Sequence, residues 1–231
     1  MSNCRTCAGS STILVVQKLS GLLENNRRWA ERMTEREPQF FAELTAQQTP
    51  RYLWIGCSDS RVPANEIVDL RPGELFVHRN VANLVSQSDL NCLSVLQYAI
   101  DVLRVDHVIV CGHYGCSGVR SVLAGDRLGL VDQWLHPIRD IREKHKDVLD
   151  ALGDDAERSD RLCELNVIEQ VRQVALTFAL RDAWQRGQGV TVHGWIYGLR
   201  DGRIRDLEVS IDSSASGKAA RFSSVDLKPA S

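Results

Sequence analysis

The sequence lacks long hydrophobic runs, an excess of charge of either sign and a readable secretory signal. Its longest uninterrupted apolar runs span only a few residues, such as 13–16, which is too short for a bilayer. The 28 Lys and Arg against 30 Asp and Glu leave a net charge of −2, so nothing draws the chain onto phosphate backbones. We therefore expect no membrane span and no nucleic-acid partner, and we expect a cytoplasmic location because no basic segment precedes a long apolar stretch.

The cysteines do not form the pattern of a disulfide framework. They number seven, which is odd, and the compartment expected without a secretory signal is reducing. We expect Cys92 and Cys111, in apolar segments, and Cys163, in a helical one, to be buried small side chains. Cys4 and Cys7 form an isolated CxxC in a polar segment. We expect an unstructured tail there, with adventitious metal or redox chemistry as the alternative.

Short apolar runs alternate with helical patterns through the chain. The runs lie at 52–56, 74–79, 107–112 and 190–196. Such near-continuous apolar runs are typical of buried parallel strands. The Asp201-Gly202 pair and the alternation over 204–211 predict a fifth strand, antiparallel to the fourth.

The helical patterns lie at 14–33, 37–47, 88–103, 115–123, 134–149 and 162–184. Neither an internal repeat nor a long linker separates these segments. We therefore expect a single α/β domain over 13–212, with 13–47 as a helical arm. The segments 1–12 and 213–231 are expected to be flexible tails.

Residue types that bind metals directly follow two of the expected strands. Cys57 comes after 52–56, and His113 and Cys116 come after 107–112. Thiolate and imidazole are ligands that zinc prefers, and two Cys with one His leave a fourth position open. Because zinc–ligand bonds are about 2.0–2.3 Å long, the first and third strands must be neighbours. With right-handed crossovers this gives a Rossmann-like order 2-1-3-4, with the site at the crevice where the strand order reverses.

Asp59 and Arg61 lie in the segment that begins at Cys57. Zinc with two thiolates is formally neutral and acidifies water weakly, so a carboxylate would be needed to orient that water. A neighbouring guanidinium would hold the carboxylate ionised and fixed. The alternatives are a structural ion pair and an Asp59 that itself takes the fourth position on the metal. We also expect the helix that opens at Cys116 to favour the thiolate of that residue.

At these residues the sequence resembles the β-class carbonic anhydrases, over roughly residues 18–212. The CxDxR and HxxC hallmarks of that family appear as Cys57, Asp59, Arg61, His113 and Cys116. The resemblance implies one zinc per chain on the two cysteines and the histidine, with Asp59 and Arg61 as the catalytic dyad. It also implies the reversible hydration of carbon dioxide to bicarbonate and a proton, by attack of zinc-bound hydroxide.

The resemblance further implies a substrate pocket and an oligomer. The pocket would use Gln48, Phe76, Val81 and Tyr98, whose apolar groups suit a nonpolar substrate. The oligomer would be a homodimer or homotetramer in which N-terminal helices wrap a partner. The apolar stripe of 14–33 fits that role, and it fits packing on its own subunit equally well.

One subgroup of the family is regulated by bicarbonate at a noncatalytic site. Its signature resembles Trp54, Arg79 and Tyr197 of this sequence. We expect low pH or high bicarbonate to place Asp59 on the zinc and to release Arg61, which would inhibit the enzyme.

Three other functions compete with carbon dioxide hydration. A related zinc hydrolase acting on a linear molecule such as carbon disulfide would use the same ligands. A noncatalytic zinc module would keep Asp59 on the metal, but it would have no need for Arg61. A nucleotide-binding fold would need Gly-x-Gly-x-x-Gly after a strand, and the sequence has no such motif free of His113 and Cys116.

Overall fold

The computed structural model describes residues 19–46 and 49–214. The predictions for Cys4, Cys7, Gln48 and most of the two tails lie outside the described residues. Backbone contacts divide the chain into two units, residues 1–46 and 47–231, and each is described by itself. The single domain expected over 13–212 therefore stays a prediction.

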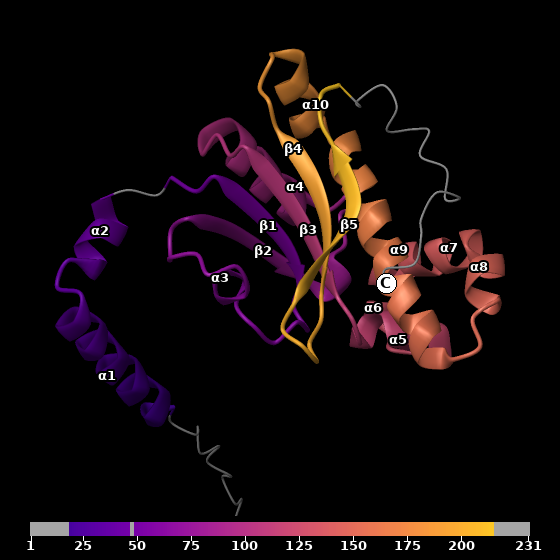
Figure 1. The fold of residues 1–231 in the computed structure, drawn as a ribbon, viewed down its shortest axis with the longest axis horizontal. Helices are drawn as coiled ribbons and strands as arrows, with labels where there is room; N and C mark the ends of the chain where they lie inside the picture. The colour runs from indigo at the N-terminus through magenta and orange to yellow at the C-terminus, as the bar shows by residue number, and fades with distance from the viewer. Residues whose placement is uncertain (1–18, 47–48, 215–231) are drawn as a thin grey trace, which may run out of the picture. The chain divides into compact units, whose positions relative to one another are not determined.

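The larger unit contains one five-stranded sheet (Figure 1). Its strands are β1 (Tyr52–Cys57), β2 (Leu75–Asn80), β3 (His107–His113), β4 (Thr191–Tyr197) and β5 (Ile204–Ile211). The order is β2-β1-β3-β4-β5, parallel except for the antiparallel β4–β5 pair. The turn before β5 uses Gly202 at φ 69°, which glycine adopts without strain. The predicted strand order and the antiparallel fifth strand are both confirmed.

The helices of this unit cover the sheet and its carboxyl end. They are α3 (Ala64–Ile67), α4 (Leu90–Gln97), α5 (Ser117–Ala124), α6 (Leu130–Trp134), α7 (His136–Lys144), α8 (Lys146–Asp150), α9 (Asp155–Leu176) and α10 (Phe178–Gln185). A 3₁₀ turn, η1 (Val81–Asn83), follows β2, and a π-helical turn, η2 (Tyr98–Val102), follows α4. None of the described helices is long and apolar enough to cross a bilayer.

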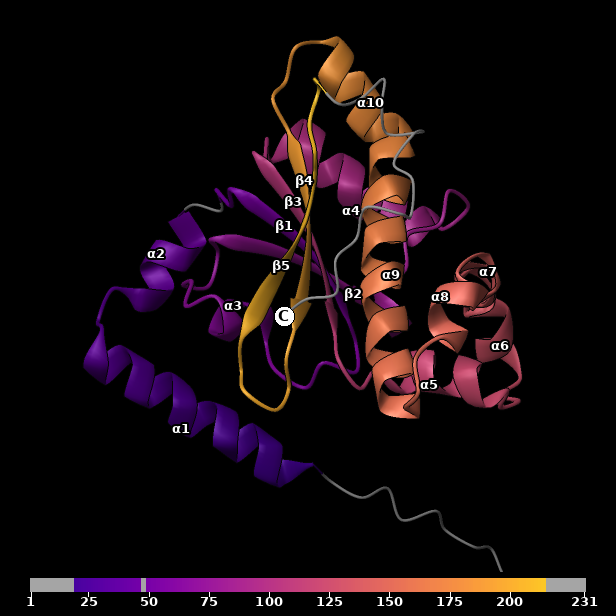
Figure 2. The ribbon, with the colours of Figure 1, turned by 45° about the vertical axis from the view of Figure 1, so that its right-hand side comes forward.

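Helix α9 runs along one face of the sheet, with α5 to α8 gathered at its first turns (Figure 2). The core on this face joins apolar side chains of the central strands to those of α4, α9 and α10, such as Ile55, Leu96 and Val171. A second core lies among α5, α7, α8 and the start of α9, and it includes Cys57 and Cys116. The two cysteines therefore stand where the sheet meets a packed helical layer, which excludes water from their sulfurs.

Several helix boundaries differ from the sequence expectations, and the single helix expected over 134–149 is instead divided among α6, α7 and α8. The helix expected from residue 162 begins seven residues earlier, where the Asp154 carboxylate accepts a hydrogen bond from the backbone N–H of Ala156. The same helix was expected to continue to residue 184. It ends at Thr177, whose extended backbone and hydroxyl bond to the Val174 carbonyl break the ladder.

The smaller unit contains α1 (Ser20–Arg36) and α2 (Phe40–Ala46). The rings of Trp29, Phe40 and Phe41 meet edge to face, with centroids 5.1–6.5 Å apart. Leu22 and Leu23 on α1 are 63% and 73% exposed. The apolar stripe predicted for this helix therefore has uncovered members within the unit.

Candidate metal centre

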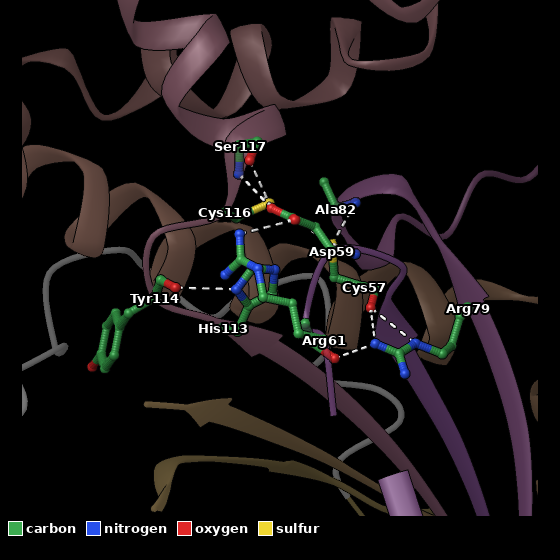
Figure 3. A network of polar contacts seen from close by, with 10 residues as sticks. Cys57, Asp59, Arg61, Arg79, Ala82, His113, Tyr114, Cys116 and Ser117 are labelled. Atoms are coloured by element: carbon green, nitrogen blue, oxygen red, sulfur yellow. Dashed lines mark hydrogen bonds and ion pairs between the residues drawn. The ribbon is translucent and has the colours of Figure 1, made fainter. Parts of the chain in front are cut away.

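Three metal-binding side chains converge at the carboxyl ends of β1 and β3 (Figure 3). The ligand atoms of Cys57, His113 and Cys116 all lie within 4.8 Å of one another, and all three side chains are buried. The sulfurs of the two cysteines are 3.8 Å apart. Cys57 ends β1, His113 ends β3 and Cys116 immediately precedes α5. The neighbouring strands bring these residues together as the sequence predicted.

The thiols of Cys57 and Cys116 differ in their pKa. Hydrogen bonding to Cys116, supported by His113, lowers the pKa of Cys57 to about 4 against the effect of burial. The same bond and burial raise the pKa of Cys116. Backbone N–H groups of Asp59 and Ala82 donate to the Cys57 sulfur at 3.3 and 3.2 Å. The thiolate favoured without a metal is therefore Cys57, and the expectation that the helix favours a thiolate at Cys116 stays a prediction.

The imidazole of His113 is oriented for metal binding. Its Nδ1 lies 3.0 Å from the Tyr114 carbonyl oxygen, so Nδ1 carries the proton and donates. Its Nε2 is buried and has no hydrogen-bond partner among the residues that the structure describes. An unprotonated, buried nitrogen beside two thiols costs free energy unless a cation binds there. The donor set of two sulfurs and one nitrogen fits zinc.

Asp59 stands beside the cluster with both carboxylate oxygens engaged (Figure 3). Its Oδ1 accepts from Arg61 Nη2 at 3.1 Å, and its Oδ2 accepts from the backbone N–H and hydroxyl of Ser117 at 2.9 and 2.8 Å. Burial acts to raise the pKa of Asp59, but the Ser117 bonds and the charge of Arg61 outweigh it, and the pKa lies below its usual value. Asp59 is thus an ionised acceptor held at the rim of the site.

Sequence reasoning missed Ser117, the residue that holds Asp59. A serine at the first turn of a helix is a known capping residue, and that signal was present directly after Cys116. Here its hydroxyl and N–H turn toward a carboxylate from another loop instead of capping its own helix. That partner is remote in sequence, so only the fold reveals it.

Arg79 binds the backbone of the segment that carries the dyad. Its guanidinium donates to the Cys57 carbonyl at 3.0 and 2.6 Å, to the Val62 carbonyl at 3.0 Å and to the Ser60 hydroxyl. Within this segment Arg61 adopts φ 63°, a left-handed conformation that strains a non-glycine residue. The Arg79 bonds therefore hold a strained loop in place.

The residues expected to bind regulatory bicarbonate lie on one face of the sheet. Trp54 and Tyr197 are buried in the same small core, and Arg79 is paired with Gly56 on the neighbouring strand. A Cβ on Gly56 would lie 2.6 Å from Trp54 Nε1, so the indole nitrogen lies directly over that glycine. Ala64 and Ile67 of α3, an element that the sequence analysis missed, contribute to this core.

The residues expected to form the substrate pocket separate into two groups. Val81 immediately precedes Ala82, the donor to Cys57, and lies close to the metal cluster. Phe76 and Tyr98 contact each other, with ring centroids 5.9 Å apart. Phe76 is four residues before the end of β2, which places it about 13 Å along the strand from the cluster.

A parallel sheet that ends in a Cys₂His cluster with a carboxylate–guanidinium pair defines a metalloenzyme of the α/β class. The family model described as carbonic anhydrase matches residues 52–204. A carbonic anhydrase of Emericella nidulans is 48% identical over 188 residues, covering 81% of this chain and 82% of that protein. One of Candida albicans is 35% identical over 84% of this chain and 69% of that protein.

Solved structures agree in fold. A Coccomyxa β-carbonic anhydrase in complex with acetazolamide has a TM-score of 0.81 at 38% identity and covers 87% of this chain and 92% of its own. A structure from a study of two tetrameric β-carbonic anhydrases of Sordaria macrospora has a TM-score of 0.78 at 39% identity, covering 83% and 98%. The chain belongs to the carbonic anhydrase family, in its β class.

Proposed function

We propose that the chain catalyses the reversible hydration of carbon dioxide to bicarbonate and a proton, with one catalytic zinc on Cys57, His113 and Cys116. The observation that carries this proposal is the buried, unpartnered Nε2 of His113 beside two converging sulfurs. Zinc at this position supplies the Lewis acidity that lets water react as a nucleophile near neutral pH.

Asp59 acts by orienting the reacting water. Its oxygens accept one bond from Arg61 and two from Ser117, which leaves acceptor capacity on the carboxylate for a further donor. Because its pKa is lowered, Asp59 stays ionised at neutral pH and holds the water without keeping its proton. Arg61 fixes the direction of that acceptor, and the released proton leaves to solvent or buffer.

The substrate pocket is proposed to form between subunits. Val81 lies next to its own metal cluster, whereas Phe76 and Tyr98 stand roughly four residues of strand away from it. Tyr98 is 48% exposed and Val81 39% exposed. A homodimer or homotetramer would bring one subunit's Phe76 and Tyr98 to the Val81 side of another, and Gln48 would join them. The relatives of known tetrameric state support such an assembly.

Bicarbonate is proposed to inhibit the enzyme through Trp54, Arg79 and Tyr197. Arg79 orders the loop that carries Asp59. An anion on the guanidinium would compete for those donors, free the strained Arg61 and let Asp59 turn onto the zinc. Low pH would act in the same direction. We expect the hydration activity to fall as the pH is lowered from about 8 to about 6. Asp59 itself stays ionised over this range, so its own titration would leave the activity unchanged there.

Asp59→Asn tests the catalytic role, with Asp132→Asn as its matched control. Asp132 is also a carboxylate that accepts from an arginine, Arg139 at 2.9 Å, and from a backbone N–H. We expect Asp59→Asn to lower the hydration rate about 10- to 100-fold with zinc retained. The control should retain the wild-type rate. A wild-type rate in Asp59→Asn would contradict the assignment.

The cytoplasmic location stays a prediction, since one relative is named a mitochondrial enzyme. Fractionation of cells that produce the tagged chain would test it.

A further inference from the structure

A second group of metal-binding side chains lies apart from the catalytic cluster. The ligand atoms of His78, Asp89 and Cys92 all lie within 4.8 Å of one another. His78 is on β2, the edge strand of the sheet, while Asp89 caps α4 and Cys92 lies in its first turn. Asp89 and Cys92 are three residues apart on a helix, so they share one face. That face meets the strand at His78.

These three side chains converge without hydrogen-bonding to one another among the described residues. Asp89 accepts from the backbone N–H of Asn91 at 3.0 Å, and His78 Nε2 lies 3.3 Å from Asn80 Nδ2. Cys92 is fully buried and His78 is 7% exposed. The three ligand atoms therefore lie close together in a largely buried place, and none of them is engaged by another member of the group.

The protonation of His78 suits a metal. The Asn80 amide is fixed by Leu84, because its Oδ1 accepts from the Leu84 N–H at 2.8 Å and its Nδ2 donates to the Leu84 carbonyl at 2.7 Å. Nε2 of His78 therefore faces an N–H donor and accepts from it with its lone pair, so the proton of the neutral ring is on Nδ1. Burial lowers the pKa of His78, which keeps the ring neutral. A metal on Nε2 would replace only the long contact to Asn80.

An ion can reach the group from solvent. A cavity of about 630 Å³ is lined by Asp89 together with Leu84, Val85 and Ser88. Asp89 is the partly exposed member of the group, whereas the other two are buried. A tetrahedral zinc needs ligand atoms about 3.3–3.8 Å apart, and these atoms already lie within 4.8 Å of one another, so a closure of at most about 1 Å would complete the site. Water from the cavity would supply the fourth ligand.

We propose that His78, Asp89 and Cys92 form a second, noncatalytic zinc site that fastens the start of α4 to the edge strand β2. Imidazole, carboxylate and thiolate are all ligands that zinc accepts. Binding exchanges the Cys92 S–H for a sulfur–zinc bond, and the proton goes to buffer. An edge strand has sheet hydrogen bonds on one side only, so a metal there adds a second restraint. The site does not depend on the proposed catalytic function.

The test is the zinc content of the holoenzyme and of two variants. Substitution of Cys4 and Cys7 by serine in every sample removes the CxxC as a source of metal. After dialysis against micromolar zinc we expect about two zinc ions per chain in this parent and about one in Cys92→Ala and in Asp89→Asn. Asparagine keeps the oxygen that caps α4, so Asp89→Asn tests the ligand without removing the cap. Both variants should hydrate carbon dioxide at the parent rate.

Cys111→Ala is the matched control, because Cys111 is a buried thiol outside both groups. It should keep both zinc ions. Cobalt substitution gives a second readout: thiolate-to-cobalt absorption should lose the contribution of one thiolate in Cys92→Ala and none in Cys111→Ala. One zinc per chain in the parent across the zinc titration, or two in folded Cys92→Ala and Asp89→Asn, would overturn the proposal.

Discussion

The two loops that supply the metal ligands are held in different ways. The dyad loop, residues 57–62, is held by the Arg79 guanidinium through backbone carbonyls, and its Arg61 is strained and half-exposed. The HYGC loop, residues 113–116, is held by a buried network. There the Tyr114 hydroxyl donates to Glu164 at 2.7 Å.

The network beneath the HYGC loop is closed to solvent. Glu164 also pairs with Arg161 at 2.7 Å, and the two side chains are 8% and 12% exposed. The Tyr114 N–H continues the sheet by donating to the Tyr197 carbonyl. The Arg61–Asp59 pair of the dyad loop is exposed, and exposed bonds exchange with water more readily than the buried ion pair of Glu164 and Arg161. We infer that the HYGC loop is the rigid half of the centre, and the proposed inhibition by bicarbonate would act on the dyad loop.

The largest effect on zinc content and hydration is expected from a substitution in the HYGC loop. Cys116→Ala removes a metal ligand, so the catalytic zinc and carbon dioxide hydration should both fall to background. Cys163→Ala is the control, because Cys163 is a buried thiol of the same core that lies outside the ligand cluster. Cys163→Ala should keep both the catalytic zinc and the hydration activity. Metal analysis and stopped-flow hydration measure the two quantities, and a fully active Cys116→Ala would exclude Cys116 as a ligand.

The network under the HYGC loop should matter for stability. Glu164→Gln removes the charge that faces buried Arg161 while keeping an acceptor for Tyr114, so we expect a loss of about 1–3 kcal/mol in the free energy of unfolding. Urea unfolding at neutral pH measures it. Glu169→Gln, a more exposed carboxylate of the same helix, should cost less. Equal losses in the two variants would remove the distinction between buried and exposed anchors.

The hydration rate should depend on the shape of the Arg79 side chain, which anchors the dyad loop. Arg79→Lys keeps the charge but cannot reach the Cys57 and Val62 carbonyls together. We expect hydration about tenfold slower with zinc content unchanged, and weaker inhibition by bicarbonate. Rates with and without added bicarbonate separate the two effects. Wild-type inhibition in this variant would place the anion elsewhere.

The smallest effect is expected for the stability contributed by ionised Asp59. Its pKa is lowered in the folded protein, so its contribution is present above the unfolded pKa of about 3.9 and is lost as the pH falls through the lower folded value. In metal-stripped protein, Asp59→Asn should cost under about 1 kcal/mol at pH 7, because the Asp59–Arg61 pair is partly exposed. The difference from wild type should shrink below about pH 4. A difference that grows with acid would have the wrong sign.

The sheet was predictable because its signals are local or geometric. Apolar runs marked each strand, and the requirement that Cys57 meet His113 determined which strands are neighbours. The end of α9 at Thr177 has neither glycine nor proline to mark it. The apolar periodicity continues past this residue, so the sequence predicted one uninterrupted helix. The four-residue helix α3 was too short to have a period.

The ligands and the dyad were predictable because their residue types carry the chemistry. Their supports were not, since Ser117, Glu164 and the carbonyls held by Arg79 are contacts between segments distant in sequence. The sequence analysis treated Cys92 as ordinary core. Its neighbours His78 and Asp89 come from a strand and a helix cap, and only the fold brings the three together.

The central claim is that a metal on Cys57, His113 and Cys116 performs the hydration. The most direct test uses the Cys92→Ala variant with serine at positions 4 and 7, so that the catalytic cluster is the one zinc site that the account leaves in the chain. The hydration rate is measured at successive zinc contents, from chelator-stripped protein to full reconstitution. The account predicts a rate proportional to bound zinc that starts at background. A stripped protein that hydrates carbon dioxide as fast as the reconstituted one would contradict it.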